Sequence, residues 1–341
     1  MGNYVYFHFA RKIVGNRAFR EGEMRMHATP LATVIVLSYN SPDLFATLRS
    51  VLEQDYPRLQ LIVTDDGSED FCRETVERFI RKYGAENLES AEILVNRENL
   101  GTVRTLNMGL MHSKGEYIFN LAGDDCFYDS RVICDWVEAF QTTGAQVMTA
   151  LREIYDEQLL NPLRTEPTQE QIRKVREFTT EELFEELAAT NFIFGCCTAR
   201  TARSIEKYGL FDEQYRLIED HPMNLRLLRM GERIVFFDRI VVKYRSGGAS
   251  SPARYNAIYA QDVDCILRSE VLPYTKHQRR VRWDYYQWKR DQKLLRRRAQ
   301  MLTNHSSRPM FLLIQIWYYL HHPWRTLRRL PARFLRKLKG D

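Results

Sequence analysis

The sequence predicts an α/β fold, in which a doubly wound and mostly parallel sheet is flanked by helices. Two observations indicate it. Short apolar runs rich in branched and aromatic residues alternate with longer segments of helical periodicity, and each run ends abruptly in a polar turn. Continuous runs of this kind are typical of strands buried on both faces of a parallel sheet. The chain has 341 residues, 44% of them hydrophobic, enough for one large core or two modest ones.

The predicted strands lie in the first part of the chain. They are expected at residues 33–37, 59–64, 92–95 and 117–121. The segments between and after them predict helices at about residues 41–54, 70–83, 102–112 and 131–142. Pro42 suits the first turn of the first of these helices. Strands that alternate with helices in this way are joined by right-handed crossovers in one sheet.

The turn at residues 123–125 is the most specific feature of the chain. It follows the fourth predicted strand, so Asp124 and Asp125 lie at the carboxyl edge, where open α/β sheets bind ligands. A pair of carboxylates there suits a hard divalent cation that holds phosphates. The alternative is that both acids cap the next helix. Asp129 and Ser130 are better placed for that capping role.

The middle of the chain departs from the strand pattern. Residues 154–177 are polar and charged and contain two prolines, which predicts an insertion without strands. A helix is expected at residues 178–189, capped by Thr179 or Thr180 with Glu182 in its first turn.

The charge is unevenly distributed. Residues 272–341 contain 18 Lys and Arg against 3 Asp and Glu, a net charge of +15; because the whole chain carries +6, the remaining residues carry −9. An acidic body with a basic tail indicates two different partners. Six cysteines without CxxC spacing, and without a preceding secretory signal, favour reduced thiols in a cytosol. They are Cys72, Cys126, Cys134, Cys196, Cys197 and Cys265.

Both ends of the chain lie outside the α/β pattern. Residues 1–30 are interpreted as an arm that packs on the body or on a membrane surface, because their aromatic run precedes the basic residues, the reverse of a signal peptide. From residue 253 the pattern becomes helical. Residues 310–320 are apolar but too few for the ~20 residues that a membrane span needs.

After Pro323, apolar and basic residues alternate at helical spacing. This pattern predicts a helix that lies on an anionic membrane surface. A solvated or oligomerising tail is the alternative, and so is a nucleic-acid-binding tail. The bulky aliphatic residues favour lipid, so no nucleic-acid partner is expected.

Several motifs, in order and spacing, resemble those of the family 2 glycosyltransferases. The resemblance covers roughly residues 31–250. It is carried by Ser38-Tyr39-Asn40, Asp65-Asp66-Gly67-Ser68, Asn96 with Asn99-Leu100-Gly101 and Asn107, Gly123-Asp124-Asp125, Gly209-Leu210-Phe211-Asp212-Glu213, and Glu219-Asp220 with Leu225 and Arg229. These enzymes are inverting, depend on nucleotide sugars and have the GT-A fold. The resemblance therefore implies a GT-A domain at residues 31–252, with a nucleotide-binding half (31–130) and an acceptor half (131–252), followed by a helical basic extension (253–341).

The resemblance also assigns roles on the nucleotide side. It implies that Asp66 accepts a hydrogen bond from a uracil ring and that Tyr39 stacks on this ring, with Ser38 and Asn40 in the same turn. For Asp66 the alternative is ordinary Asx-turn chemistry, which the Asp-Gly-Ser sequence suits. Two further residues, Asn99 and Gly101, are expected to shape the floor of the nucleotide pocket.

Asp125 is the expected metal ligand, with Asp124 nearer the hydroxyls of the ribose or the sugar. The leaving group is a nucleoside diphosphate, and bound Mn²⁺ or Mg²⁺ would offset the negative charge that builds on it. Many family members carry a further acid before these two, which this chain lacks. Members often also place a His after the last strand, where Arg245 stands here. Arg245 or the glycine-rich amides at residues 247–248 are expected to hold the diphosphate, and a lid hinge at those glycines is the alternative.

On the acceptor side, the resemblance implies that Asp220 is the general base. Glu219 and Gly195 are expected beside the acceptor, since residues 191–197 resemble the segment that lines its pocket. The alternative is that Glu219 or Asp220 only caps the helix that follows, with Pro222 in its first turn.

These expectations define one main hypothesis. The protein is expected to transfer a sugar from a nucleotide sugar, with UDP as the expected nucleotide, to a glycan or lipid-linked acceptor in cell-surface polysaccharide synthesis. It is expected in the cytoplasm, peripherally on the inner face of the plasma membrane. The alternative is a non-catalytic nucleotide-sugar-binding or scaffold protein with a degenerate site. A sugar nucleotidyltransferase is disfavoured, because no glycine-rich, lysine-containing loop follows the first strand. The donor sugar, the linkage and the oligomeric state are not predicted.

Overall fold

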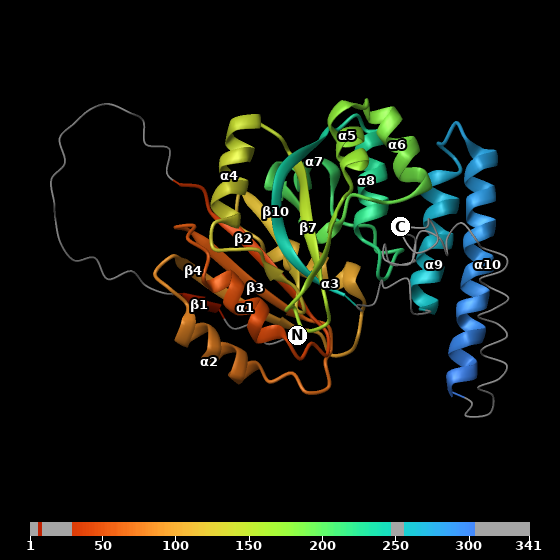
Figure 1. The fold of residues 1–341 in the computed structure, drawn as a ribbon. Helices are drawn as coiled ribbons and strands as arrows, with labels where there is room; N and C mark the ends of the chain where they lie inside the picture. Colours follow the sequence, from red (N-terminus) through yellow and green to blue (C-terminus); the bar gives the residue numbers. More distant parts are fainter. Residues whose placement is uncertain (1–5, 9–28, 247–255, 304–341) are drawn as a thin grey trace, which may run out of the picture. The chain divides into compact units, whose positions relative to one another are not determined.

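The computed structural model describes residues 6–8, 29–246 and 256–303. The chain divides into two compact units, of which the first comprises Met1–Ser251 and Asn256–Trp283. This first unit contains the sheet and every candidate site residue. Its elements are shown in Figure 1.

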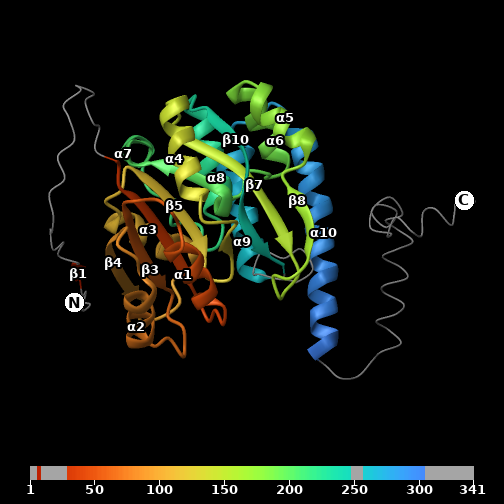
Figure 2. The ribbon, with the colours of Figure 1, turned by 60° about the vertical axis from the view of Figure 1, so that its left-hand side comes forward.

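One ten-stranded sheet organises this unit, in the order β1-β4-β3-β2-β5-β9-β7-β10-β6, with β8 paired to β7. The strands are β1 (Tyr6–His8), β2 (Ala32–Ser38), β3 (Leu59–Asp65), β4 (Leu88–Val95), β5 (Tyr117–Ala122), β6 (Cys126–Phe127), β7 (Val147–Tyr155), β8 (Pro162–Glu166), β9 (Thr198–Thr201) and β10 (Ile234–Arg245). The neighbours β4, β3, β2 and β5 are parallel, whereas β9 is antiparallel to both β5 and β7. The predicted mostly parallel sheet is therefore confirmed for the first half of the chain and becomes mixed in the second (Figure 2).

The helices are α1 (Leu44–Leu52), α2 (Arg73–Tyr83), α3 (Thr102–His112), α4 (Val132–Thr143), α5 (Gln169–Glu177), α6 (Thr180–Ala189), α7 (Ala202–Tyr208), α8 (Asp220–Arg229), α9 (Ala257–Ile266) and α10 (Gln278–Thr303). A short 3-10 turn, η1 (Gly195–Cys197), precedes β9, and a π-helical turn, η2 (Leu267–Val271), follows α9. The four predicted strands and the first four predicted helices are confirmed within a few residues at their ends. Helix α6 has the predicted capping box, in which Thr179 and Glu182 bond reciprocally.

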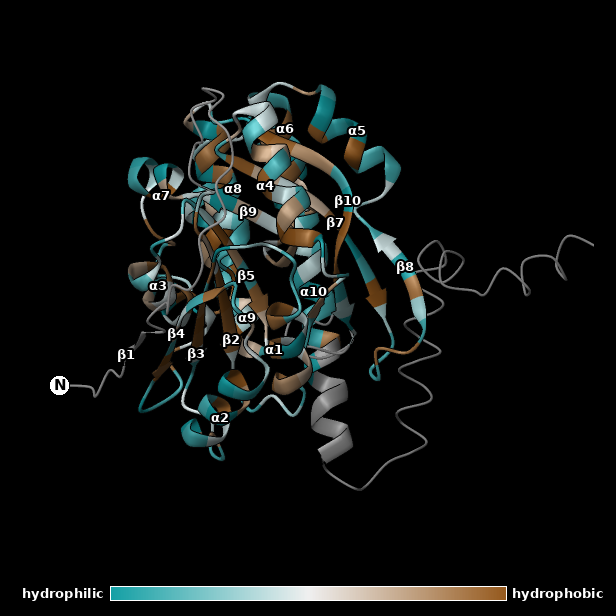
Figure 3. Ribbon diagram, turned by 90° about the vertical axis from the view of Figure 1, so that its left-hand side faces the viewer, coloured by the Kyte–Doolittle hydropathy of each residue, from teal (hydrophilic) through white to brown (hydrophobic). Residues whose placement is uncertain are grey.

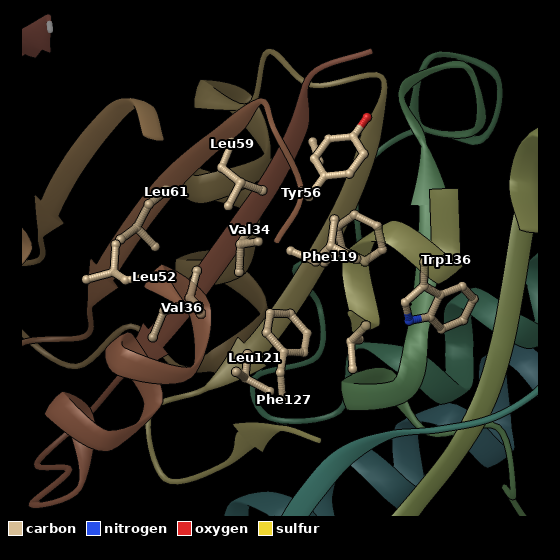
Figure 4. Packing of buried hydrophobic residues seen from close by; sticks show 14 of the residues in the cluster. Val34, Val36, Leu52, Tyr56, Leu59, Leu61, Phe119, Leu121, Phe127 and Trp136 are labelled. Atoms are coloured by element: carbon tan, nitrogen blue, oxygen red, sulfur yellow. The ribbon is translucent and has the colours of Figure 1, made fainter. Parts of the chain in front are cut away.

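The central strands bury both of their faces, as their apolar sequences predict. Val34 and Val36 of β2 pack with Leu52 of α1 in the main core cluster (Figure 4). The opposite face of β2 lies against α3, where a side chain on Gly109 would approach Ile35 to 2.6 Å. Each fully buried branched side chain contributes about 1.5–3 kcal/mol to folding. Figure 3 shows these strands as hydrophobic and α2 as largely hydrophilic.

Residues 154–177 contradict the prediction of an insertion without strands. β7 continues to Tyr155, β8 pairs with it antiparallel, and α5 follows with a capping box between Thr168 and Gln171. The reason is that β8 is an exposed edge strand, so it lacks the apolar pattern of a buried one. Pro162 is tolerated because it is the first residue of that edge strand.

The predicted boundary at residues 252–253 separates segments that pack together. Helix α9 and the π turn belong to the same compact unit as the sheet. The hydroxyl of Tyr215 lies 2.9 Å from that of Ser269, and Arg229 of α8 forms an ion pair of 2.5 Å with Glu270. The division into domains stays a prediction.

The two ends of the chain are described only in part. Strand β1 pairs antiparallel with β4, forms this edge of the sheet and is the part of the N-terminal arm that the structure describes. Among the described helices, none is both long and apolar enough to cross a bilayer. The apolar run at 310–320 and the basic segment after Pro323 lie outside the described residues.

Candidate active site

The register of the parallel strands brings the polar turns together. Ser38 pairs with Asp65, Leu37 with Ala122, and Asp65 with Val95. The turns after β2, β3, β4 and β5 therefore meet at one edge of the sheet. Backbone hydrogen bonds tie them further, because the amide of Asp66 donates to the carbonyl of Ser38 at 2.8 Å.

The turn after β2 presents an exposed aromatic ring. Tyr39 is 53% exposed, which leaves its ring free to stack on a planar ligand. Asn40 has a positive φ of 47°, its amide donates to the hydroxyl of Ser68 at 2.7 Å, and its side chain accepts from the amide of Glu69. Asn40 thus joins this turn to the one after β3. The side chain of Ser38 is buried.

Asp66 lies where the sequence predicts, but its carboxylate faces the loop after β4. It accepts from the amides of Leu100 (2.8 Å) and Gly101 (2.9 Å), from the side-chain amide of Asn96 (3.0 Å) and from the hydroxyl of Thr105 (2.7 Å). Three of these bonds end at Oδ1 and only the bond from Gly101 ends at Oδ2, so Oδ2 keeps an acceptor position. Asp66 therefore holds this loop in place, and recognition of a base by it stays a prediction.

Asn99 and Gly101 contact a residue from the other half of the chain. The guanidinium of Arg216 donates to both the carbonyl and the side-chain oxygen of Asn99 at 2.9 Å. Gly101 has φ 94°, and a Cβ there would approach the carbonyl oxygen of Arg216 to 2.5 Å. The loop after β4 is thereby fixed to the turn before α8. The buried Asn107 binds the backbone of Phe211 through both polar atoms of its amide, so its side chain has a structural role.

Asp125 is almost completely buried, with 1% of its surface exposed. One carboxylate oxygen accepts from the amide of Arg245 at 2.8 Å, whereas Oδ2 has no hydrogen-bond partner among the described residues. Burial and the nearby Cys196 and Asp124 raise the pKa of Asp125 well above its usual range. A buried oxygen without a partner is costly unless a ligand binds it.

Arg245, at the end of β10, closes the other side of these acids. Its side chain donates to the carbonyl of Asp124 at 3.0 Å and to the carbonyl of Glu157, and it lies 3.2 Å from the carboxylate of Asp43. It is held by protein groups, so a role in binding diphosphate stays a prediction. Residues 247–248, the other expected diphosphate-binding segment, lie outside the described residues.

Asp220 is the first residue of α8, in the second half of the chain. One oxygen accepts from the amide of Gly195 (3.0 Å) and from the side chain of Asn191 (3.2 Å), and the other accepts from the amide of His221 (2.6 Å). These bonds orient the carboxylate against the segment predicted to line the acceptor pocket. Asp220 therefore does more than cap α8, because only its bond to the amide of His221 is a capping contact.

Glu219 directly precedes Asp220. Its side chain makes no capping bond to α8, and a Cβ on Gly195 would collide with its carboxylate. Burial and the adjacent charge of Asp220 raise the pKa of Glu219 to about 8. The two neighbouring acids thus differ: Asp220 has three backbone or amide donors, and Glu219 packs against a glycine.

Residues 33–209 match the family model described as glycosyl transferase family 2. The chain belongs to this family. A glycosyltransferase of Rickettsia typhi, itself uncharacterized, is 26% identical over 254 residues, which cover 72% of this chain and 75% of that protein. A putative teichuronic acid biosynthesis glycosyltransferase of Bacillus subtilis, TuaG, is 26% identical over 224 residues, which cover 63% of this chain and 79% of the relative.

Solved structures show that this glycosyltransferase has the GT-A fold. S. aureus TarS, in complex with UDP-GlcNAc, matches with a TM-score of 0.54 at 18% identity, over 74% of this chain and 69% of that one. The mannosyltransferase PcManGT from Pyrobaculum calidifontis, in complex with GDP-Man and Mn²⁺, matches with a TM-score of 0.53 at 19% identity, over 88% and 84%. The expected family, fold and enzyme class are confirmed.

The residues at the carboxyl edge of this glycosyltransferase fit a divalent cation. No cluster of three His, Cys, Asp or Glu side chains that could hold a metal occurs in the part of the chain that the structure describes. Mg²⁺ is commonly bound by only one or two carboxylates together with substrate phosphates and water. The unpartnered Oδ2 of Asp125 is suited to that role, with Asp124 adjacent.

Arg152 lies beside the candidate metal ligand, and no sequence pattern indicates it. Its guanidinium packs between the rings of Phe194 (3.6 Å) and Tyr244 (4.2 Å) and forms an ion pair of 2.8 Å with Glu166. It also lies 3.8 Å from the sulfur of Cys196. The pairing of β7 with β8 and β10 brings Arg152 beside Glu166 and Tyr244, and the turn η1 with its N-cap adds Cys196 and Phe194. Cys197 is buried and Cys196 is partly buried.

Proposed function

We propose that this glycosyltransferase transfers a sugar from a UDP-sugar to a hydroxyl group of a glycan or lipid-linked acceptor, with inversion at the anomeric carbon. The observation that carries the proposal is the unpartnered, buried Oδ2 of Asp125 at the edge where the polar turns meet. TarS bound to UDP-GlcNAc and the mannosyltransferase bound to GDP-Man and Mn²⁺ support a nucleotide-sugar donor and a divalent metal. The similarity to TuaG supports a role in cell-surface polysaccharide synthesis.

In the proposed mechanism, Tyr39 stacks on the base, and Asp125 holds Mn²⁺ or Mg²⁺ with Asp124 nearby. The metal, when bound, supplies charge stabilisation for the departing diphosphate. Asp220 removes the proton of the acceptor hydroxyl as this attacks the anomeric carbon from the face opposite the diphosphate. The hydrogen bonds from Gly195 and Asn191 keep the carboxylate of Asp220 in one orientation for this transfer.

Asp125→Ala tests the proposal. The purified wild-type chain is heated with a panel of UDP- and GDP-sugars, with Mn²⁺, with Mg²⁺ or with EDTA. A donor at about 100 times its dissociation constant should stabilise the fold by about 2.7 kcal/mol. The variant should lose the metal-dependent part of this stabilisation and the release of UDP in a transfer assay. Circular dichroism confirms that the variant is folded.

Two results would count against the proposal. Tight, Mn²⁺-dependent UDP binding by Asp125→Ala in calorimetry would remove Asp125 from the metal role. Donor binding by the wild type without transfer to any acceptor would favour the alternative, a nucleotide-sugar-binding or scaffold protein.

The proposed location is the cytoplasmic face of the plasma membrane. The support is the sequence of residues 272–341, which carries a net charge of +15 and, after Pro323, an amphipathic pattern. A peripheral position of this kind would bring the site close to a lipid-linked acceptor.

A further inference from the structure

A buried carboxylate from α9 binds the backbone directly before the candidate general base. Asp262 is 4% exposed. It accepts hydrogen bonds from three successive amides, those of Arg216 (3.0 Å), Leu217 (2.6 Å) and Ile218 (3.1 Å). Bonds from backbone N–H groups to a charged acceptor are about twice as strong as neutral ones. Asp262 therefore fixes the backbone of the turn at residues 216–218.

The turn at residues 216–218 is followed by the candidate general base, and its first residue binds the loop after β4. Glu219 and Asp220 follow it immediately. Arg216, its first residue, clamps Asn99 with two hydrogen bonds, and its carbonyl accepts from the amide of Val103 at 3.2 Å. The turn at residues 216–218 thus connects the nucleotide-side loop at Asn99 to the candidate general base, Asp220.

Helix α9 is itself firmly attached to this unit. Arg229 of α8 pairs with Glu270, just after α9, and stacks over the ring of Tyr274 at 4.1 Å. Tyr259 of α9 is close enough to the candidate base to be affected by its charge. Burial, followed by the charges of Asp220 and other acids, raises the pKa of the Tyr259 hydroxyl. The helix lies beyond residues 33–209, the part that matches the family model.

We propose that Asp262 is a positioning residue for sugar transfer: by holding the amides of residues 216–218, it keeps Asp220 and the loop at Asn99 in their relative places. This inference rests on the proposed function. A misplacement of about 1 Å can cost about 10²-fold in rate. Loss of the Asp262 carboxylate should therefore act mainly on the chemical step.

Asp262→Asn is the test variant, because it keeps the size of the side chain and removes the negative charge from an acceptor whose Oδ2 takes bonds from all three amides and whose Oδ1 takes a second bond from Arg216. Asp264→Asn is the matched control: Asp264 lies on the same helix but pairs with Arg268 at 2.8 Å. Arg216→Met is a second variant, which removes the clamp on Asn99 and keeps the backbone turn.

Three measurements separate the roles. Hydrogen exchange of the amides of residues 216–218 should be faster by about tenfold or more in Asp262→Asn than in the wild type or the control. The kcat of Asp262→Asn should fall by about 10–100-fold, with the donor KM changed by less than about threefold. Arg216→Met should instead raise the donor KM. The control should match the wild type in all three measurements.

The outcomes distinguish this inference from the proposed function. A wild type that transfers no sugar contradicts the proposed function, whereas a fully active Asp262→Asn contradicts the inference alone. Faster exchange with unchanged kcat would also overturn it, because Asp262 would then have only a structural role. If Asp262→Asn does not fold, Asp262→Glu keeps the charge, and it should fold with a kcat between those of the control and zero; a kcat equal to that of the control overturns the inference.

Discussion

At the scale of single residues, Glu219 and Asp220 are neighbours in sequence with different surroundings. Asp220 accepts hydrogen bonds from Asn191, Gly195 and His221, which hold its carboxylate in one orientation. Glu219 has burial and a like charge beside it, which favour its protonated form. Two acids whose environments differ in this way can take different roles in one site.

Asp220→Asn separates the base role from the capping role. The asparagine keeps the shape and most of the capping capacity, so loss of the cap alone should have a mild effect of about 1 kcal/mol or less. Loss of a general base should lower turnover by about 10²–10⁴-fold with donor affinity preserved. Steady-state kinetics and donor calorimetry measure the two quantities. Near-native turnover, or a product with the donor's anomeric configuration retained, would refute the base role.

Glu219→Gln should change how stability depends on pH. The folded pKa of Glu219, about 8, lies above its unfolded value, so its protonated form stabilises the fold at low pH. This contribution is fully present below the unfolded pKa and is lost as pH rises through about 8. Glutamine cannot ionise, so the Tm of the variant relative to the wild type should increase between about pH 5 and pH 8. Parallel Tm profiles would show that the pKa of Glu219 is not raised.

At the scale of elements, the site depends on turns that only particular residues can form. Gly101 has φ 94° and ψ 161°, a combination that is essentially restricted to glycine. Gly101 directly precedes α3 and lies against the backbone of Arg216, the residue that binds Asn99. The close contact between Gly101 and Arg216 therefore fixes both the start of α3 and the position of the loop at Asn99. Gly144, the C-cap of α4, has φ 66°, and a Cβ at this position would meet no atom of the described residues within 4 Å.

Gly101→Ala and Gly144→Ala therefore form a matched pair. Both introduce a Cβ at positive φ, but only Gly101→Ala brings it against the backbone of Arg216. We expect Gly101→Ala to cost about 1–3 kcal/mol more in the free energy of unfolding. Urea denaturation measures the difference. Equal losses in the two variants would mean that the loop moves away from Arg216 without cost.

At the scale of the whole molecule, the chain joins an acidic body to a basic C-terminal region. Residues 308–341 contain 8 Lys and Arg against one Asp. Each basic residue near an anionic surface contributes about 1 kcal/mol to binding. The candidate active site lies entirely in the first compact unit, which ends at Trp283. Catalysis and membrane binding are thus expected to be separable.

Deletion of residues 308–341 tests this separation. The shortened chain should lose sedimentation with anionic liposomes and retain activity on small, soluble acceptors. Neutral liposomes are the control for the dependence on anionic lipid, and a DNA duplex tests the alternative of a nucleic-acid-binding tail. Failure of the full-length chain to sediment with anionic liposomes would contradict the membrane role, and sedimentation with DNA alone would favour a nucleic-acid-binding tail.

The sequence by itself determined the strands of the first half and the polar turns at their ends, while the roles it predicts for the acids at positions 124, 125 and 220 stay predictions. It could do so because apolar periodicity and turn residues act over a few positions in the chain. The exposed edge strand β8 was missed for the same reason, since its residues carry no apolar pattern.

Only the tertiary structure decided which groups meet in the site. Asp125 binds the amide of Arg245, 120 positions away, and Asn99 binds Arg216 across 117 positions. Asp262 reaches the turn before Asp220 from a helix that sequence analysis placed in the extension. Such contacts depend on strand register and on the packing of distant elements, and local sequence patterns encode neither.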